Sequence, residues 1–267
     1  MFQKLGQHFL INQSAIKKMI KSLKLKSGET IVEIGPGKGA LTFPLIKECG
    51  ENDCKIIAVE RDPELAASLE LLAVRNNLQI EIIKDDALKI LSEITKTYKL
   101  KPISYKLVGN IPYYITGKLL RILSELKNKP ELTIVMIQKE VAERITAKSP
   151  KMNLLAAAVQ FWAKPEILFT LKPDNFSPPP KVESAVIKLT TLHPKPYTLN
   201  PEIYYKLIKI LFKQPRKTIL NNLKTGLKIT PELIENNLKS LGIDPEFRPQ
   251  NLSVAQIINF VRSDLTK

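Results

Sequence analysis

The sequence predicts an α/β fold, in which a parallel sheet is covered by helices on both faces and a smaller all-helical domain follows. Two observations support this expectation. Short runs of β-branched residues alternate with helical stretches over roughly the first two thirds of the chain, whereas only helical periodicity follows a proline-rich break near residue 193. Such alternation is typical of parallel sheets, because each new parallel strand needs a crossover connection. With 267 residues, 44% of them hydrophobic, the chain can form a sizeable core.

Seven segments are predicted as strands, because they are short, rich in β-branched residues and bounded by polar or turn residues. The last two flank a proline-rich loop instead of a helix, so we expect them to pair antiparallel at the sheet edge. The predicted strands are 30–34, 56–59, 80–83, 104–108, 132–138, 166–170 and 183–189, and the predicted helices between them are 40–49, 63–75, 87–97, 116–126 and stretches within 139–162.

Both ends of the chain are predicted to be helical and basic. Residues 1–28 contain six lysines and no acidic residue, with a basic amphipathic helix over 13–25. Residues 29–192 form the α/β domain, 193–200 a linker, and 201–267 a helical domain. From residue 195 onward there are twelve Lys and Arg against six Asp and Glu. Helices are expected there at 202–212, 218–223, 231–241 and 254–263.

The charge balance points to a polyanionic partner. The formal net charge is +15 and the isoelectric point is about 9.6, and Lys and Arg bind nucleic acid by releasing counterions from phosphates. A solvated lysine-rich surface is the alternative. Two cysteines and two histidines are too few for a disulfide framework or a metal cluster, so no metal is expected. No apolar run spans a membrane and no signal core is present, so we expect a cytoplasmic protein.

A glycine-rich turn follows the first predicted strand of the α/β domain. Gly35 and Gly37 allow a ligand to approach the backbone closely. Glu60 ends the next strand, 21 residues after Gly39, where a carboxylate can accept hydrogen bonds from both ribose hydroxyls. This pattern predicts an adenosine-containing cofactor and is shared by dehydrogenases and methyltransferases. Glu33 ahead of the glycines and the G-x-G-x-G spacing favour a methyltransferase.

Two acidic residues follow the third strand of this domain. Ligands of open parallel sheets lie beyond the carboxyl ends of the strands. We therefore expect Asp86 to accept a hydrogen bond from the cofactor's adenine amine, with Asp85 as its solvated neighbour. A helix N-cap is the structural alternative for this pair.

The motif that predicts the chemistry is Asn110-Ile111-Pro112-Tyr113-Tyr114, directly after the fourth strand. The exocyclic nitrogen of adenine is a poor nucleophile, because its lone pair is delocalised into the ring. Two acceptors, the Asn110 side-chain oxygen and the Ile111 carbonyl, would bind the two amine hydrogens and localise that lone pair. Pro112 would fix the turn and Tyr113 would stack on the base. The contribution is positioning and electrostatics, and the methylated nitrogen loses its proton to water.

We expect a second aromatic residue to contact the same base. Phe176 stands beside three consecutive prolines, which would hold the loop stiff and present the ring to the base. The target adenine must leave its stack for this contact to form. Without the other motifs, Phe176 would be assigned to the core.

Together these motifs resemble the ribosomal RNA adenine N6,N6-dimethyltransferase family of the KsgA type. The resemblance covers most of the chain. It departs from the usual family pattern at 152–156 and at 214–216. The matching segments are 6–10, 33–37, Glu60, 86–87, 110–114, Phe176, 178–184, 216–218 with Asn221 and Leu223, and 248–253.

The resemblance implies a seven-stranded Rossmann-like class I methyltransferase fold with a small C-terminal helical domain. It implies dimethylation of two adjacent adenosines in the hairpin near the 3′ end of small-subunit rRNA, within a pre-30S-like particle and by an enzyme we expect to be monomeric. The implied cofactor is S-adenosyl-L-methionine, with contacts at His8, Leu10, Gly35, Gly37, Glu60, Asp86 and Asn110. RNA contacts are expected at Lys17, Lys18, Lys213, Arg216, Lys217 and Arg248.

Three alternatives stay open at this point. The related large-subunit dimethylases of the macrolide-resistance type share residues 110–113, although Tyr114 and residues 178–184 favour the small-subunit type. A ribosome-assembly or RNA-binding factor could keep the fold without catalysis, but it would not need Asn110, Tyr113 and Gly35. A dehydrogenase shares only the cofactor pattern.

Overall fold

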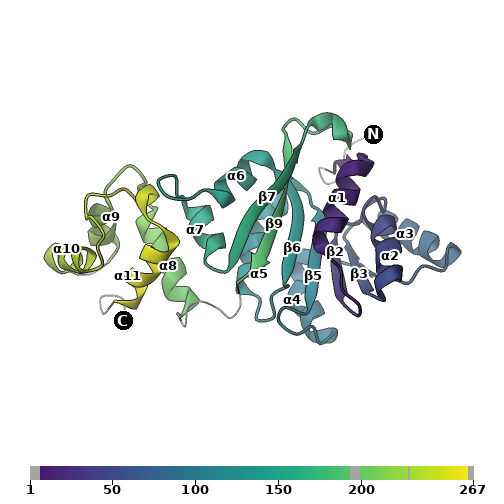
Figure 1. Cartoon of the computed structure of the whole chain (residues 1–267), viewed down its shortest axis with the longest axis horizontal. Helices are drawn as coiled ribbons and strands as arrows, with labels where there is room; N and C mark the ends of the chain where they lie inside the picture. Colours follow the sequence, from purple (N-terminus) through teal and green to yellow (C-terminus); the bar gives the residue numbers. More distant parts are fainter. Residues whose placement is uncertain (1–6, 193–198, 228, 264–267) are drawn as a thin grey trace. The chain divides into compact units, whose positions relative to one another are not determined.

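The computed structural model describes residues 7–192, 199–227 and 229–263 (Figure 1). The chain divides into two units, which are described separately. The sheet unit comprises the described residues of 1–142 and 165–191, and the helical unit comprises those of 143–164 and 192–267. No helix among these residues is long and apolar enough to cross a membrane, and no group of three metal-ligating side chains is found among them.

A seven-stranded sheet forms the centre of the sheet unit, as the sequence predicts. The order of the strands is β4-β3-β2-β5-β6-β9-β7, and the first five run parallel to their neighbours. Strand β9 runs antiparallel to β6, and β7 lies beyond it at the edge. The bounds are β2 (Thr30–Ile34), β3 (Lys55–Glu60), β4 (Glu81–Lys84), β5 (Tyr105–Asn110), β6 (Leu132–Gln138), β7 (Ala163–Leu171) and β9 (Ser184–Thr191).

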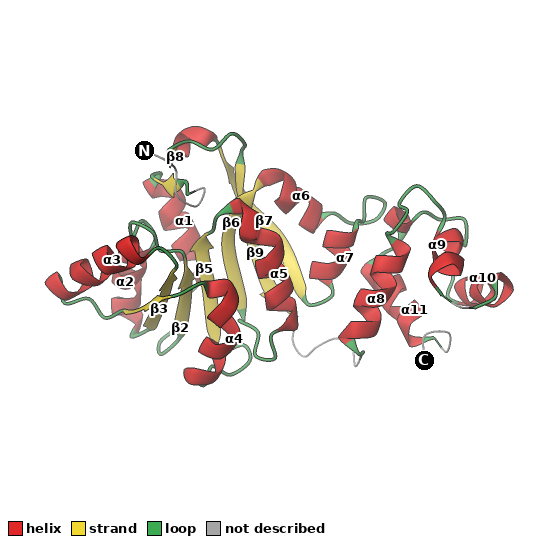
Figure 2. Ribbon diagram, turned by 180° about the vertical axis from the view of Figure 1, so that it is seen from behind, coloured by secondary structure: helices red, strands yellow, loops and turns green. Residues whose placement is uncertain are grey.

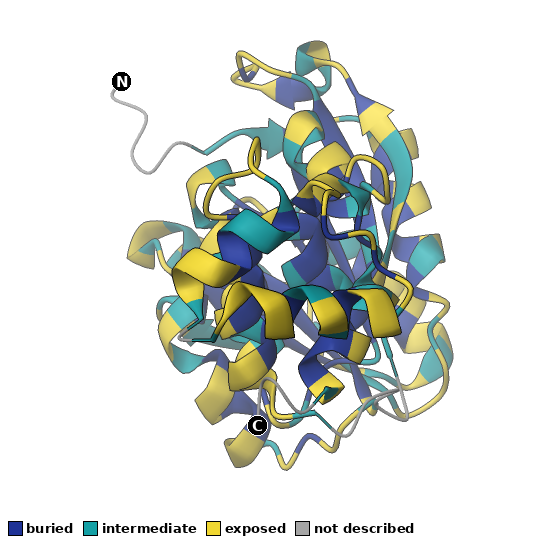
Figure 3. Cartoon of the chain, turned by 90° about the vertical axis from the view of Figure 1, so that its left-hand side faces the viewer, coloured by how far each residue is buried: buried dark blue, intermediate teal, exposed yellow. Residues whose placement is uncertain are grey.

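Helices cover both faces of this sheet. Helices α1 (Gln13–Leu23) and α2 (Thr42–Asn52) pack against each other on one face, and α4 (Ala87–Thr97) and α5 (Thr116–Glu125) lie on the other (Figures 1 and 2). Helix α3 (Pro63–Arg75) packs on β3 and β4, and α6 (Lys139–Thr146) follows β6. Buried residues concentrate on the strands and on the inward faces of the helices (Figure 3).

Helix α1 is amphipathic in the way its sequence suggests. Asn12 caps its N-terminus by accepting from the Ala15 N–H, and the apolar residues from Ile16 to Leu23 are buried in the core of the sheet unit. The end of α1 is tied to the sheet by a buried lysine. Lys106 of β5 donates from Nζ to the Glu29 carboxylate at 2.6 Å and to the Lys24 carbonyl at 2.8 Å. The lysines on the outer face of α1 remain exposed.

A second, two-stranded ribbon was not predicted. Strands β1 (Phe9–Leu10) and β8 (Phe176–Ser177) pair antiparallel, with Leu10 opposite Phe176. The pairing continues through the Ile11 N–H, which donates to the Asn175 carbonyl at 3.0 Å. The ribbon therefore joins the beginning of the described chain to the proline-rich loop between β7 and β9.

The helical unit has a core of its own. Its helices are α7 (Leu154–Gln160), α8 (Pro201–Leu211), α9 (Ile219–Gly226), α10 (Pro231–Ser240) and α11 (Val254–Arg262). The Tyr204 hydroxyl, which is buried, donates to the Ala157 carbonyl at 2.9 Å and joins α8 to α7. The predicted boundary differs here, because the apolar face of residues 152–157 packs into this core and brings 143–164 into the unit. Most of the predicted linker, residues 193–198, lies outside the described residues.

Candidate active site

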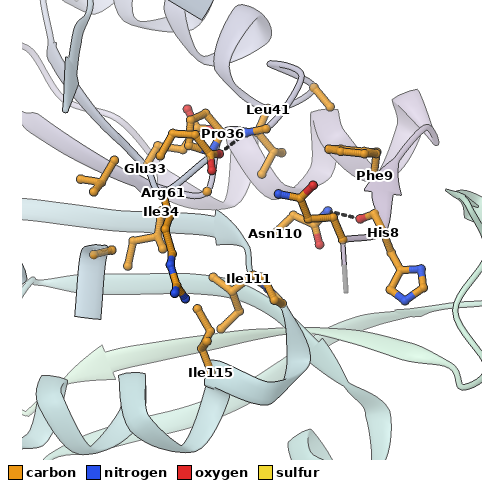
Figure 4. A pocket seen from close by; sticks show the side chains of 18 of the residues that line it. His8, Phe9, Glu33, Ile34, Pro36, Leu41, Arg61, Asn110, Ile111 and Ile115 are labelled. Atoms are coloured by element: carbon orange, nitrogen blue, oxygen red, sulfur yellow. Dashed lines mark hydrogen bonds between the residues drawn. The ribbon is translucent and has the colours of Figure 1, made fainter. Parts of the chain in front are cut away.

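A pocket opens at the carboxyl ends of β2, β3 and β5, the place where ligands of open parallel sheets bind (Figure 4). Four loops, strand β1 and the two residues before it line the pocket. All but one of the predicted catalytic and cofactor-binding residues contribute to this lining. The lining residues are Gln7 to Leu10, Glu33 to Gly37, Ala40, Leu41, Val59 to Arg61, Asp85 to Ala87, and Asn110 to Ile115.

The glycine turn after β2 is held in a conformation that other residues rarely adopt. Gly35 and Gly37 have φ angles of +67° and +57°, and the Gly35 N–H donates to the Val59 carbonyl at 2.9 Å. A Cβ added to Gly37 would lie 3.0 Å from the Phe9 ring. The turn therefore depends on glycine for its conformation and for the close packing of β1 against it.

The Glu60 carboxylate fastens this turn to the end of β3. One oxygen accepts from the Gly37 N–H and the other from the Asp62 N–H, both at 2.9 Å. The side chain is only 4% exposed. Each carboxylate oxygen can accept further hydrogen bonds, so Glu60 can hold the turn and still bind hydroxyl groups of a ligand.

Glu33 is the most unusual acid of the pocket. It is 1% exposed, and no donor among the described residues reaches either carboxylate oxygen. Burial raises the pKa of Glu33 to about 8; the nearby Thr42 hydroxyl partly opposes this shift, although it forms no hydrogen bond with Glu33 in the structure, and the Glu60 carboxylate adds to it. A buried carboxylate without a donor is costly, and a cationic group in the pocket would relieve that cost.

Asp85 and Asp86 lie at the end of β4, as the sequence predicts. Asp86 is the N-cap of α4, because one carboxylate oxygen accepts from the Leu88 N–H at 2.9 Å. The other oxygen lies 4.0 Å from the Arg61 guanidinium. Asp85 is the more exposed of the two and accepts from the Asp86 N–H. The capping alternative is therefore realised, and an oxygen of Asp86 is left for a ligand.

The orientation of the Asn110 side chain is fixed by the chain's N-terminal segment. Its amide nitrogen donates to the His8 carbonyl at 2.8 Å (Figure 4). This bond leaves the amide oxygen as the atom that can accept from a ligand, and no donor among the described residues reaches it. Ile111 is 2% exposed and, with Pro112, follows it in the lining. The pocket thus contains an acceptor with a defined orientation.

Tyr113 is held from two sides. Its hydroxyl forms a hydrogen bond of 2.7 Å with the hydroxyl of Ser184, which is fully buried. The His8 ring stacks on the Tyr113 ring with centroids 5.9 Å apart, and Nδ1 of His8 lies 2.8 Å from the Pro178 carbonyl. Burial raises the pKa of the Tyr113 hydroxyl, and the bond to Ser184 opposes this. The ring is therefore fixed, with His8 over one face.

Phe176 does not lie at the pocket, where the sequence predicts it. The side chain is 3% exposed in the core of the sheet unit and is absent from the pocket lining. It lies opposite Leu10 in the β1–β8 ribbon, and both side chains belong to the core of the sheet unit. In this structure Phe176 is a core residue outside the pocket lining, and its contact with the target base stays a prediction.

The residues predicted to contact RNA are all exposed. Lys17 and Lys18 lie on α1 in the sheet unit. In the helical unit, a buried amide shapes the loop that carries the basic residues after α8. The Asn222 side chain accepts from the Gln214 N–H and donates to the Gln214 carbonyl, both at 3.0 Å. Lys213, Arg216 and Lys217 lie on this loop, and Arg248 precedes a 3-10 turn, Pro249–Asn251.

Several residues of the pocket were not assigned a role from the sequence. The sequence pattern uses Glu33 only to favour a methyltransferase, although a lone acid within a buried strand is itself a signal. Arg61 and Phe9 have no such signal. Gly109 of β5 lies outside the lining, and the structure explains why it is glycine, because a Cβ there would lie 2.5 Å from the Ile34 carbonyl oxygen.

Comparison with known proteins agrees with this geometry. The family model described as ribosomal RNA adenine dimethylase matches residues 2–263. A "Ribosomal RNA small subunit methyltransferase A" of Dehalococcoides mccartyi (strain CBDB1) is 38% identical over 94% of this chain and 84% of that protein. The protein of the same name from Pelotomaculum thermopropionicum is 39% identical over 98% of this chain and 90% of that protein.

Solved structures share the fold. A dimethyladenosine transferase from Plasmodium falciparum superposes with a TM-score of 0.79 at 24% identity, over 95% of this chain and 96% of that one. The 23S rRNA methyltransferase ErmE superposes with a TM-score of 0.72 at 23% identity, over 94% and 97% of the two chains.

The sheet order, the glycine turn and the pocket beyond the strand ends define a class I methyltransferase, a class that uses S-adenosylmethionine. The matched family narrows this class. The chain belongs to the ribosomal RNA adenine dimethylase family.

Proposed function

We propose that this chain dimethylates the N6 amines of two adjacent adenosines in the 3′-terminal hairpin of small-subunit rRNA, using S-adenosylmethionine. The observation that carries the proposal is the arrangement at the end of β5. The Asn110 amide nitrogen is fixed by His8, so its oxygen is the available acceptor in the same pocket as the glycine turn. An adenine amine is a ligand that such an acceptor would bind and activate.

The residues of the pocket fit the proposed cofactor. S-adenosylmethionine supplies an electrophilic methyl group on a sulfonium when it is bound. Gly35 and Gly37 let a ligand approach the backbone, and Glu60 is placed for ribose hydroxyls. The second Asp86 oxygen, 4.0 Å from the Arg61 guanidinium, can still accept from an adenine amine. The orphaned Glu33 carboxyl suits an ammonium group, because an ion pair would offset the cost of burying its charge. His8 and Leu10 supply the remaining contacts from the N-terminal segment.

The target base would be held by the turn after β5. The Asn110 oxygen and the Ile111 carbonyl accept the two amine hydrogens and localise the nitrogen lone pair, while Tyr113 offers a ring fixed by Ser184. Pro112 sets the turn that brings these groups together. No general base is needed, since the methylated nitrogen is acidic enough to lose its proton to water. The residues contribute orientation and electrostatic stabilisation, for which losing one donor or acceptor costs about 10²–10³ in kcat.

The choice of small-subunit rRNA is supported by the names and identities of the relatives. The fold is shared with a large-subunit enzyme, so it does not separate the two substrates. Labelled methyl transfer onto undermethylated small subunits, followed by nucleoside analysis, tests the choice. We expect N6,N6-dimethyladenosine in small-subunit rRNA. Label confined to large-subunit rRNA would contradict the assignment, and unchanged transfer by Asn110→Ala would contradict the mechanism.

We further propose that exposed basic side chains bind the phosphates of the rRNA in a pre-30S-like particle in the cytoplasm, and that the enzyme acts as a monomer. Lys17 and Lys18 on α1 form one such set. The other consists of Lys213, Arg216, Lys217 and Arg248. Replacing one phosphate-binding lysine by alanine should weaken RNA binding for all sequences and reduce the salt dependence of log Kd by about one.

A further inference from the structure

Tyr114 is an exposed aromatic residue at a pocket whose other apolar side chains are buried or partly buried. It lines the pocket and yet is 61% exposed, more than any other large hydrophobic residue of that lining in the described chain. Its hydroxyl has no hydrogen-bond partner among the described residues. Single exposed apolar residues are common on protein surfaces, so the exposure is informative only because of where the ring lies.

The local backbone separates Tyr114 from its neighbour. Residues Tyr113–Ile115 form a 3-10 turn, in which successive side chains point about 120° apart. Tyr113 is anchored on the buried Ser184, and Tyr114 consequently points out at the mouth of the pocket. Two consecutive tyrosines therefore offer one fixed ring inside the site and one accessible ring at its edge.

The helix surface next to Tyr114 is open and carries one unpaired lysine among the described residues. Gly117 and Lys118 follow Tyr114 at the spacing that places residues on one helical face, and both are exposed. A Cβ added to Gly117 would meet no atom within 4 Å, so the helix surface is bare beside the ring. Lys118 forms no ion pair with a described residue, whereas Arg121 on the next turn pairs with Glu125 at 2.9 Å. Lys118, which forms no ion pair with a described residue, thus lies one helical turn beyond the exposed ring of Tyr114.

We propose that Tyr114 is a second stacking platform, which binds the nucleobase adjacent to the target adenine, with Lys118 placed for a phosphate of the same strand. This inference rests on the proposed function, because it assumes an RNA adenine in the pocket. Extruding the target removes one stacking partner from its neighbour in the strand, and an aromatic ring at the pocket mouth replaces that partner. Stacking on a ring is tolerant of sequence, so the ligand is any nucleotide of unpaired RNA.

The position also suits the repetition of the reaction. If the two targets are adjacent, the base on Tyr114 while the first adenine is methylated is the second adenine. Holding it at the mouth keeps the strand on the enzyme between the two modifications. Loss of the ring should therefore weaken RNA binding and leave the chemistry at the first adenine intact.

The test uses the full chain and a hairpin RNA with the two adjacent adenines. The adenine proposed to stack on Tyr114 is replaced by 2-aminopurine, and the target adenine is kept. Stacking quenches the fluorescence of 2-aminopurine. With saturating protein and S-adenosylhomocysteine, Tyr114→Ala should give a complex about twofold or more brighter than wild type, while Tyr114→Phe should match wild type. The KM for undermethylated small subunits should rise about tenfold in Tyr114→Ala, equivalent to about 1.4 kcal/mol, with kcat unchanged.

The matched control is Leu71→Ala, since Leu71 on α3 is 60% exposed and lies outside the pocket lining. It should behave as wild type in both measurements. Equal fluorescence of wild type and Tyr114→Ala would overturn the proposal, and so would a fall in kcat at constant KM. Loss of affinity in Tyr114→Phe as large as in Tyr114→Ala would also overturn it, because the ring would then not be the binding element. Absence of methyl transfer by the wild type would count against the proposed function, whereas the fluorescence tests the platform without turnover.

Discussion

Replacing Glu33 by glutamine should make the sheet unit more stable at alkaline pH and change it little near pH 5. The pKa of Glu33 is raised from its ordinary value of 4.5 to about 8 by complete burial. Between these two values the unfolded chain loses the proton and the folded chain keeps it, so the free energy of unfolding falls as the pH rises. At about 1.4 kcal/mol for each pH unit, the full effect above pH 8 reaches at most about 5 kcal/mol.

Glutamine has nearly the shape of glutamic acid and does not ionise, so Glu33→Gln removes this pH dependence. The free-energy advantage of the variant should grow from near zero at pH 5 to at least about 2 kcal/mol at pH 8.5 and then level off. Glu93→Gln, a change of an exposed carboxyl on α4, is the control and should show no such trend.

The measurement has to report on the sheet unit. The single tryptophan, Trp162, belongs to the helical unit, so its fluorescence would follow the wrong part of the chain. Hydrogen exchange of β2 peptides as a function of urea, read by mass spectrometry at pH 5 to 9 with correction for the intrinsic exchange rate, gives the local free energy. Parallel pH profiles for wild type and Glu33→Gln would refute the reasoning, because Glu33 would then ionise as easily when folded as when unfolded.

Three further outcomes are expected. Gly109→Ala should lower the stability of the sheet unit by about 1–3 kcal/mol, since its Cβ would lie 2.5 Å from a backbone oxygen of β2. Gly117→Ala, with free space around the new Cβ, should be neutral or stabilising by up to about 1 kcal/mol in the same urea experiment. Lys106→Met should cost about 3–5 kcal/mol because it leaves the carboxylate of Glu29 without its buried partner, and the double variant with Glu29→Gln should recover much of this loss. If Glu33 pairs with the ammonium of S-adenosylhomocysteine, calorimetry should give a Kd that falls by up to tenfold per pH unit between pH 6 and 8, and a pH-independent Kd would exclude the pairing.

The helices and strands could be predicted because the hydrophobic periodicity of each segment and the capping residues at its ends indicate the same bounds. The bounds predicted for β2, β6, α3 and α4 are those of the structure, and the seven-stranded sheet is confirmed. Asp62 and Asp86 mark the starts of α3 and α4 as N-caps, which is a local signal. The grouping of 143–164 with the helical unit could not be predicted, because helical periodicity identifies an apolar face and not the partner it packs on.

The sequence predicted those site residues whose type is unusual at their position. It did not predict the side chains that only the pairing of distant segments brings to the site or removes from it. Asn110, Gly35 and Glu60 lie at one pocket because the carboxyl ends of parallel strands meet at one edge of the sheet. The β1–β8 ribbon has two residues in each strand, too few for any period, so the wrong position for Phe176 followed from missing it. The roles of the pocket residues stay predictions until the variants are measured.

The short ribbon has a thermodynamic consequence for the two proposed ligands. One wall of the cofactor pocket belongs to residues 7–10, which are secured to the proline-rich loop through Leu10 opposite Phe176 and through His8 at Pro178. The same segment orients Asn110 through the His8 carbonyl. The segment thus contributes to both proposed ligand sites, so a change in its position on binding one ligand would change the affinity for the other. By reciprocity, each would change the affinity of the other by the same factor.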